Sequence, residues 1–151
     1  MITGTSQLNL DAKGRMAIPT KHREELLQQC GGNVVVTISA DDRCLWLYPA
    51  TVWNEVRKNI VALPSINPHS RRLKQMLIGH AEECEMDSTG RILLTSTLRE
   101  FAKLQKKVVL VGLGDKCEIW DAERWKAHQD SFLSGSLDPS EVPPELASLN
   151  F

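Results

Sequence analysis

Asp11-Ala-Lys-Gly-Arg15 is the stretch of sequence that decides the fold, and the same pattern returns as Asp87-Ser-Thr-Gly-Arg91, 76 residues later. The Asp at the first position can accept N–H bonds from the backbone two residues on, and the Gly at the fourth supplies the positive φ of a tight hairpin turn. One such turn is common in proteins. Two turns at matched positions predict that one unit is used twice about a pseudo-twofold axis, like the halves of a fused dimer. The residues expected to build the two turns are Asp11, Gly14, Asp87, Gly90 and Arg91.

Each turn is followed by the same series of predicted elements. A short hydrophobic strand leads into a helix-like stretch, a β-branched run, a second short strand and an amphipathic segment that carries a tryptophan. In the first copy these are residues 16–18, 20–29, 34–38, 44–48 and Trp53, and in the second 92–94, 97–104, 108–111, 117–120 and Trp125. By the tryptophans the offset has fallen to 72, and a loss of four residues is expected in loops. The sequence therefore predicts a β-rich α+β fold built from a tandem duplication.

The boundaries of the two units follow from the prolines and the charge pattern. Pro64 and Pro68 push the residues before them out of helical geometry, so the chain between the copies is expected to be a linker. A short basic helix follows it, and its cations are interpreted as a solvated face. The predicted organisation is a first unit at 5–60, a linker with the basic helix at 61–78, a second unit at 79–128 and an acidic tail at 129–151.

Composition favours a reduced, cytoplasmic protein without a membrane partner. The N-terminus has neither a basic nor an apolar signal region, and no run of 18 apolar residues occurs. The four cysteines are spread singly, which is typical neither of a disulfide framework nor of a zinc module. The net charge is −1, but residues 128–151 hold four of the 19 acidic residues and no Lys or Arg. Residues 1–127 therefore carry 18 basic and 15 acidic side chains, a net charge of +3.

The pattern predicts no enzyme, no metal, no cofactor and no small-molecule substrate. His80 and Cys84 have the spacing of two ligands on a helix, but their segment is predicted to be a strand, where residues four apart lie about 13 Å apart. Gly112-Leu-Gly114 is only a fragment of a phosphate-binding loop and is interpreted as a turn. No catalytic residue is assigned, and a small hydrolase is the weakest of the alternatives considered.

The duplicated turns, their hydrophobic flanks and the tryptophan-bearing ends resemble the MraZ family of bacterial transcriptional regulators. Gly79-His-Ala-Glu-Glu-Cys-Glu-Met-Asp87 is similar to that family's second turn, and Leu113-Gly-Asp-Lys-Cys-Glu-Ile-Trp120 to its late strands. The resemblance implies swapped-hairpin units of the SpoVT-AbrB type, here a pseudo-twofold barrel with flanking helices. It also implies a ring-like homo-oligomer, a nucleoid-associated location and binding to direct repeats upstream of a cell-division and cell-wall gene cluster.

The first turn is the better candidate for contact with double-stranded DNA, because it is more basic than the second. Binding to DNA rewards positive potential and is weakened by nearby carboxylates. The strand before the second turn carries Glu82, Glu83 and Glu85, so the second copy is expected to serve mainly in assembly. Arg15 is the residue expected to contact a base edge. The residues expected to contact phosphates are Lys13, Lys21 and Arg23.

Two other interpretations stay open. Arg15 could form an ion pair with Asp11 that only fastens the hairpin. The chain could also be an oligomeric module that binds a protein partner and has no sequence-specific DNA binding. The dependence of affinity on salt separates this second interpretation from DNA binding, since log affinity for DNA falls linearly with log salt.

Overall fold

The first half of the chain forms four strands and two helices. A computed structural model describes residues 1–135 and 139–151. In order, the elements are β1 (Ile2–Asn9), β2 (Arg15–Ala17), α1 (Thr20–Cys30), β3 (Asn33–Ile38), β4 (Leu45–Pro49) and α2 (Ala50–Val61). In β3, five of the six residues are β-branched. Both α1 and α2 begin directly after a proline, whose fixed φ suits the start of a helix.

The second half repeats this order. After α3 (Pro68–Leu73) and a π-helical turn, η1 (Lys74–Ile78), come β5 (Glu82–Glu85), β6 (Arg91–Leu93), α4 (Ser96–Phe101), β7 (Lys107–Gly114), β8 (Cys117–Asp121) and α5 (Ala122–Ser134). The chain ends in a short 3-10 turn, η2 (Pro139–Glu141), and α6 (Pro144–Ala147). The predicted α+β, β-rich class is confirmed, and so are the positions of the repeated elements.

Four predictions of where elements lie differ from the structure. Gly112-Leu-Gly114, expected to be a turn, forms the end of β7 and pairs with β1. The strand expected from Gly79 begins only at Glu82, because η1 runs to Ile78 and the N–H of Gly79 still bonds to the carbonyl of Lys74, at 3.0 Å. The helix expected to reach Leu104 ends at Phe101. The segment predicted as a tail from residue 129 begins as the last part of α5, and its Asp138 lies outside the described residues.

The strands form one six-stranded antiparallel sheet in the order β1-β7-β8-β4-β3-β5, and β2 and β6 form a separate two-stranded sheet. The predicted barrel is not confirmed. Within residues 1–135 and 139–151 the larger sheet stays open, with β1 and β5 at its edges, because β2 and β6 pair with each other and do not bridge those edges.

Strand pairing crosses between the two units. β1, from the first unit, pairs along its whole length with β7 of the second, from Ile2 opposite Gly114 to Asn9 opposite Lys107. β5, from the second unit, pairs with β3 of the first, and Glu85 lies opposite Asn33. Neither half therefore completes its own sheet, and the two halves share one hydrophobic core.

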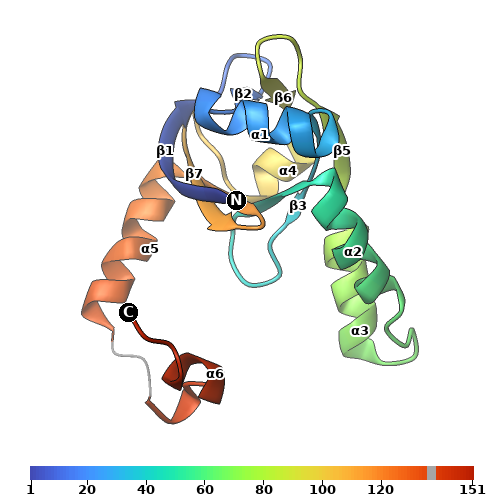
Figure 1. The fold of residues 1–151 in the computed structure, drawn as a ribbon, viewed down its shortest axis with the longest axis vertical. Coiled ribbons are helices and arrows are strands. Elements are labelled where there is room, and N and C mark those ends of the chain that lie inside the picture. The colour runs from blue at the N-terminus through green and yellow to red at the C-terminus, as the bar shows by residue number, and fades with distance from the viewer. Residues whose placement is uncertain (136–138) are drawn as a thin grey trace.

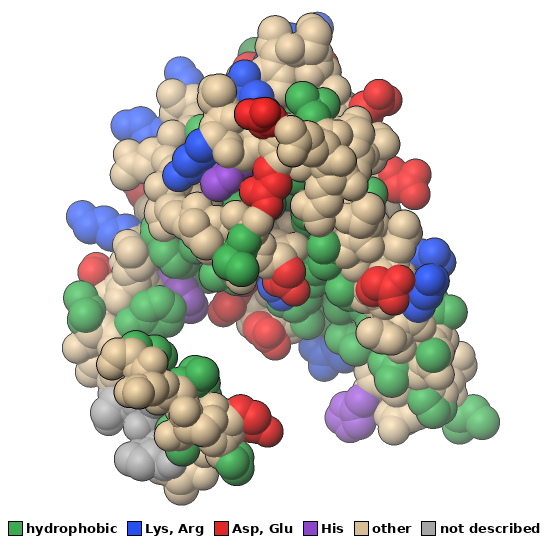
Figure 2. Space-filling model, viewed as in Figure 1, with side chains coloured by type: hydrophobic (Ala, Val, Ile, Leu, Met, Phe, Trp, Pro, Cys, Tyr) green, Lys and Arg blue, Asp and Glu red, His purple; other side chains and the backbone are tan. Residues whose placement is uncertain are grey.

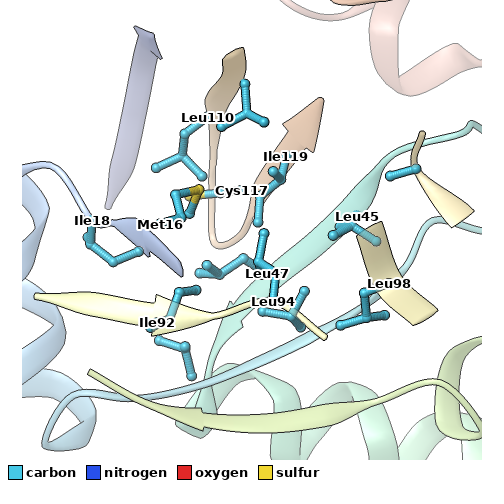
Figure 3. Packing of buried hydrophobic residues seen from close by; sticks show 14 of the residues in the cluster. Met16, Ile18, Leu45, Leu47, Ile92, Leu94, Leu98, Leu110, Cys117 and Ile119 are labelled. Carbon is cyan, nitrogen blue, oxygen red and sulfur yellow. The ribbon is translucent and has the colours of Figure 1, made fainter. Parts of the chain in front are cut away.

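This shared core lies between the larger sheet, the β2–β6 pair and the helices α1 and α4 (Figure 3). Met16 and Ile92 enter it from the β2–β6 pair, and Leu26 of α1 and Leu98 of α4 enter from the helices, each at most 1% exposed. Burial of one such side chain contributes about 1.5–3 kcal/mol.

Two helical arms extend from one end of the body, one formed by α2 and α3 and the other by α5 and α6 (Figure 1). Trp53 of α2 packs in one cluster with Tyr48 of β4 and Leu77 of η1, and α5 packs through Trp125 on Trp120. No helix in the described ranges combines the length and the apolar character that a bilayer-spanning segment needs. Both Asp-x-x-Gly-Arg turns project from the opposite end of the body, beside α1 (Figure 1).

Candidate nucleic-acid interface

The first turn is held by one carboxylate. Oδ1 of Asp11 accepts N–H bonds from the backbone of Lys13 and Arg15, both at 2.9 Å, and Oδ2 accepts from Nε of Arg15 at 2.7 Å. The backbone closes the hairpin with a bond from Gly14 N to Asp11 O at 3.0 Å, and Gly14 has φ 85°. The ion pair thus exists, and the bond at Nε does not consume the four N–H donors on the two Nη atoms of Arg15.

The second turn repeats this geometry atom for atom. Oδ1 of Asp87 accepts from the backbone of Thr89 and Arg91 at 2.9 Å, and Oδ2 accepts from Nε of Arg91 at 3.0 Å. The hydroxyl of Thr89 adds a bond to Oδ1 at 2.8 Å. The two turns therefore have the same backbone hydrogen-bond pattern, and any functional difference between them comes from the residues around them.

These bonds also set the electrostatics of the turns. The backbone N–H of Arg15 is the largest cause that lowers the pKa of Asp11, and the backbone N–H of Arg91 does the same for Asp87. Both carboxylates are ionised at neutral pH. Each arginine is consequently oriented from a rigid turn before any ligand binds.

The two units hold each other's turns through the backbone. The N–H of Leu94 bonds to the carbonyl of Gly14 at 3.0 Å, and the N–H of Ile18 bonds to the carbonyl of Gly90 at 2.8 Å. The end of each short strand is thereby attached to the turn of the other unit. The turns of this molecule cannot move independently of each other.

Two arginines add a second connection of the same kind. Arg99 donates from Nε to the carbonyl of Leu94 at 3.0 Å, and its guanidinium lies over Gly14, where an added Cβ would stand 2.8 Å from Cζ. Arg23 donates to the carbonyl of Ile18 at 2.6 Å and lies over Gly90 in the same way. Arg99 was not among the residues predicted from the sequence. Its only signal was the offset of 76 from Arg23, which carried no meaning before the strands were seen to cross.

The cations predicted to bind DNA are not all in one place. Lys13 is exposed in the first turn and Arg15 is half-buried there, with 31% of its side chain accessible. Lys21 is exposed at the start of α1, with Nζ near Gly4 of β1. Arg23 lies at the second turn, half-buried against Gly90. Geometry therefore brings Lys13 and Arg15 together and separates Arg23 from them.

Comparison with known proteins identifies the family. The family model described as "MraZ protein, putative antitoxin-like" matches this chain twice, at residues 1–76 and 77–141. The chain belongs to the MraZ family. A protein of Halorhodospira halophila named transcriptional regulator MraZ is 47% identical over 150 residues, 99% of each chain. Proteins with the same name from Nitrosomonas europaea and Pseudomonas putida are 47% identical over 146 residues (97% of each chain) and 42% identical over 149 (99% of each).

Charge separates the two flanks of this MraZ-family chain. In the view of Figure 2, Lys and Arg side chains gather on the flank of β1, and Asp and Glu side chains project on the flank of β5. The acidic residues of β5, Glu82, Glu83 and Glu85, stand where β1 has Ser6, Gln7 and Asn9 at the repeat offset of 76. The first turn thus follows an uncharged strand and the second turn an acidic one.

The residues that could have supported other chemistry are engaged elsewhere. Within the described part of the chain, no three His, Cys, Asp or Glu side chains gather as metal ligands would. Nδ1 of His80 lies 2.9 Å from the carbonyl of Met76. Burial raises the pKa of Cys84 to about 11 and that of Cys117 to about 12. These thiols are protonated at neutral pH, and the thiolate is the form that attacks substrates and binds metals.

Proposed function

We propose that this MraZ-family chain is a sequence-specific DNA-binding transcriptional regulator and not an enzyme. The observation that carries the proposal is the first turn: an arginine oriented by its own hairpin, beside the exposed Lys13, on the less acidic of two otherwise matching turns. The names of the relatives support the regulatory role.

The contacts of each basic residue favour one of three roles: contact with a base, contact with a phosphate, or positioning of a turn. Arg15 would place its Nη donors on a base edge in the major groove, where a bidentate pair to guanine gives about 1–3 kcal/mol of discrimination. Lys13 and Lys21 would contact phosphates, which fix the register without reading sequence. For Arg23, the contacts with Ile18 and Gly90 favour a positioning role for the second turn over direct contact with DNA.

Several copies would have to act together, because one hairpin is a small contact. A ring-like homo-oligomer that presents the first turn to direct repeats would gain roughly 10²–10⁴ in avidity without any new type of contact. We propose the repeats upstream of a cell-division and cell-wall gene cluster as the target, and a cytoplasmic, nucleoid-associated location. The proposed units are swapped hairpins at 5–60 and 79–128, joined by 61–78 and followed by the 129–151 segment. The pairing of β1 with β7 and of β5 with β3 supports them.

The test compares two arginines in matching turns. Fluorescence anisotropy would measure binding of wild type, Arg15→Ala and Arg91→Ala to a duplex that carries the upstream repeats and to a scrambled duplex. Both substitutions remove the same ion pair from the same backbone frame, so a loss of hairpin stability affects both. We expect Arg15→Ala to lose preference for the repeats and Arg91→Ala to keep it, with light scattering showing unchanged assembly.

Other outcomes would contradict the proposal in different ways. Equal preference in wild type and Arg15→Ala would mean that Arg15 only fastens its hairpin. If the wild type binds neither duplex, or binds both without the salt dependence of phosphate contacts, the chain would instead be an oligomeric module for a protein partner.

A further inference from the structure

We infer that the DNA-binding surface includes a phosphate-binding rim from the second unit, formed by Lys103 and Lys106 beside the first turn. This inference rests on the proposed function and extends it, because the second unit was expected to serve mainly in assembly. The two lysines are 88 residues or more from Arg15 in sequence, and only the crossed strand pairing brings them to the turn.

The first turn and the connection between α4 and β7 enclose a common hollow. It has a volume of about 450 Å³ and is lined by Asp11, Ala12 and Gly14 on one side and by Gln105 and Lys106 on the other, with Arg99 and two leucines completing it. A second hollow of about 400 Å³ shares Arg99 and Gln105 with the first and is lined also by Lys103. The two hollows therefore adjoin, and together they are called the groove below; its lining extends from the first turn to Lys103.

The backbone that carries the two lysines is fixed. The carbonyl of Lys106 accepts a bond from the N–H of Leu10, one residue before the turn, at 2.8 Å. The N–H of Gln105 donates to Oδ1 of Asp121 at 3.0 Å, and Asp121 is only 4% exposed. Lys103 and Lys106 are both exposed. Both lysines are thus solvent-exposed, Lys106 on a backbone bonded to the residue before the first turn and Lys103 on a backbone whose N–H bonds to the carbonyl of Glu100 at 3.2 Å.

The second turn lacks a lysine at the position that Lys106 holds beside the first turn. There the N–H of Met86 bonds to the carbonyl of Gly32 at 3.0 Å, so Gly32 holds the position of Lys106. Lys107, opposite Asn9, is matched by Asn33, opposite Glu85. Lys106 and Lys107, which lie near the first turn, are therefore replaced by the uncharged Gly32 and Asn33 near the second turn.

Nearby carboxylates do not cancel this positive charge. Asp11 lines the first hollow, but its oxygens accept the backbone bonds of its turn and the guanidinium of Arg15. Glu100 is exposed on the wall of the second hollow. Glu100 is therefore the one carboxylate in the lining of the two hollows that the turn does not engage, and the buried Asp121 accepts the N–H bonds of Gln105 and Arg124. The ligand that fits is a phosphate of the duplex whose bases Arg15 contacts, since a phosphate contact needs charge and no particular sequence.

The test removes both lysines and measures binding against salt. Lys103 has φ 53°, in the left-handed region that favours glycine, so Lys103→Gly removes the charge without straining the backbone. We expect Lys103→Gly/Lys106→Gln to weaken binding to the repeat and scrambled duplexes alike, by about 5-fold near 0.15 M salt for each lost phosphate contact. The slope of log affinity against log salt should fall by about 0.9 per contact. The ratio between the two duplexes should stay that of wild type.

The matched control is Arg71→Gln/Arg72→Gln. It removes two exposed charges from α3, on an arm at the other end of the body (Figure 1). If the lysine variant keeps the salt slope of this control, the rim does not exist. If the wild type shows no preference for the repeats, the proposed function fails, while the slopes still decide whether the lysines contact phosphate.

A second variant should raise the affinity for DNA, and it can be measured whether or not the lysine variant folds and assembles. Glu100→Gln removes the one unengaged carboxylate of the groove and should tighten binding to both duplexes at low salt. If the affinity of Glu100→Gln equals that of wild type, the inference is wrong. This outcome is decisive even if light scattering shows that the lysine variant does not assemble.

Discussion

Met16 of β2 and Ile92 of β6 lie directly opposite each other, and they are the same position in the two copies of the repeat. Trp46 and Glu118, 72 residues apart, face each other between β4 and β8 in the same way. Residues that are equivalent in the two copies can face each other in an antiparallel pair only if a twofold relation passes between them. The two units are therefore related by a pseudo-twofold axis, which relates β2 to β6 and also β4 to β8.

Ile92→Ala should destabilise the whole molecule and not one half. The side chain is 1% exposed in the shared core, and its truncation leaves a cavity that costs about 2–5 kcal/mol. Leu93→Ala, at the neighbouring position and 52% exposed, is the control and should change stability by less than about 0.5 kcal/mol. Urea unfolding followed by fluorescence measures both. Two separate transitions for Ile92→Ala would show that the halves do not share a core.

Gly90→Ala should destabilise more than Gly114→Ala. Both glycines have positive φ, 76° and 100°, so the strain of an L-residue is common to both. A Cβ at Gly90 would also stand 2.6 Å from Cδ of Arg23, whereas the nearest atom at Gly114 is 3.9 Å away. We expect a loss of about 1–3 kcal/mol at Gly90 and a smaller one at Gly114 by chemical denaturation. Equal losses in unfolding free energy would mean that the Arg23 side chain moves away from a new Cβ at no energetic cost and does not stabilise the second turn.

Glu118→Ala should destabilise the sheet at its centre. The carboxylate accepts from the indole N–H of Trp46 at Oε2 and from that of Trp120 at Oε1, both at 3.0 Å. Truncation leaves two partly buried donors without this acceptor, at about 1–3 kcal/mol. Glu83→Ala, on the exposed edge strand β5, is the control. Urea unfolding gives the stabilities, and a shift of tryptophan emission should accompany the loss in Glu118→Ala alone.

The stability that the turn carboxylates contribute should depend on acid pH. The backbone N–H of Arg91 is the largest cause that lowers the pKa of Asp87 below its ordinary value, so the folded state binds its proton less readily than the unfolded state. The contribution is therefore fully present at neutral pH and is lost as the pH falls below about 4. Unfolding free energies of wild type and Asp87→Asn should differ at pH 7, and the difference should shrink progressively as the pH falls below about 4. A constant difference would show that the carboxylate charge is not what stabilises the turn.

The sequence by itself determined the local parts of this protein. Asp11 and Arg15 are four residues apart, so their bonds form within one hairpin whatever the rest of the chain does, and the repeat at Asp87 follows for the same reason. The alternation of β-branched runs with helical stretches likewise determined the order of the elements. The resemblance of the duplicated turns and their flanking motifs indicated the family.

Only the tertiary structure decided which unit each strand joins. Pairing between distant strands depends on register and on which faces are buried together, and neither is written in a local pattern. That pairing leaves the sheet open, places Arg99 on Gly14 and brings Lys106 to the first turn. It also sets Trp46 of β4 opposite Glu118 of β8. The turn could be predicted, but its neighbours come from the other half of the chain, because neither half can bury its hydrophobic face alone.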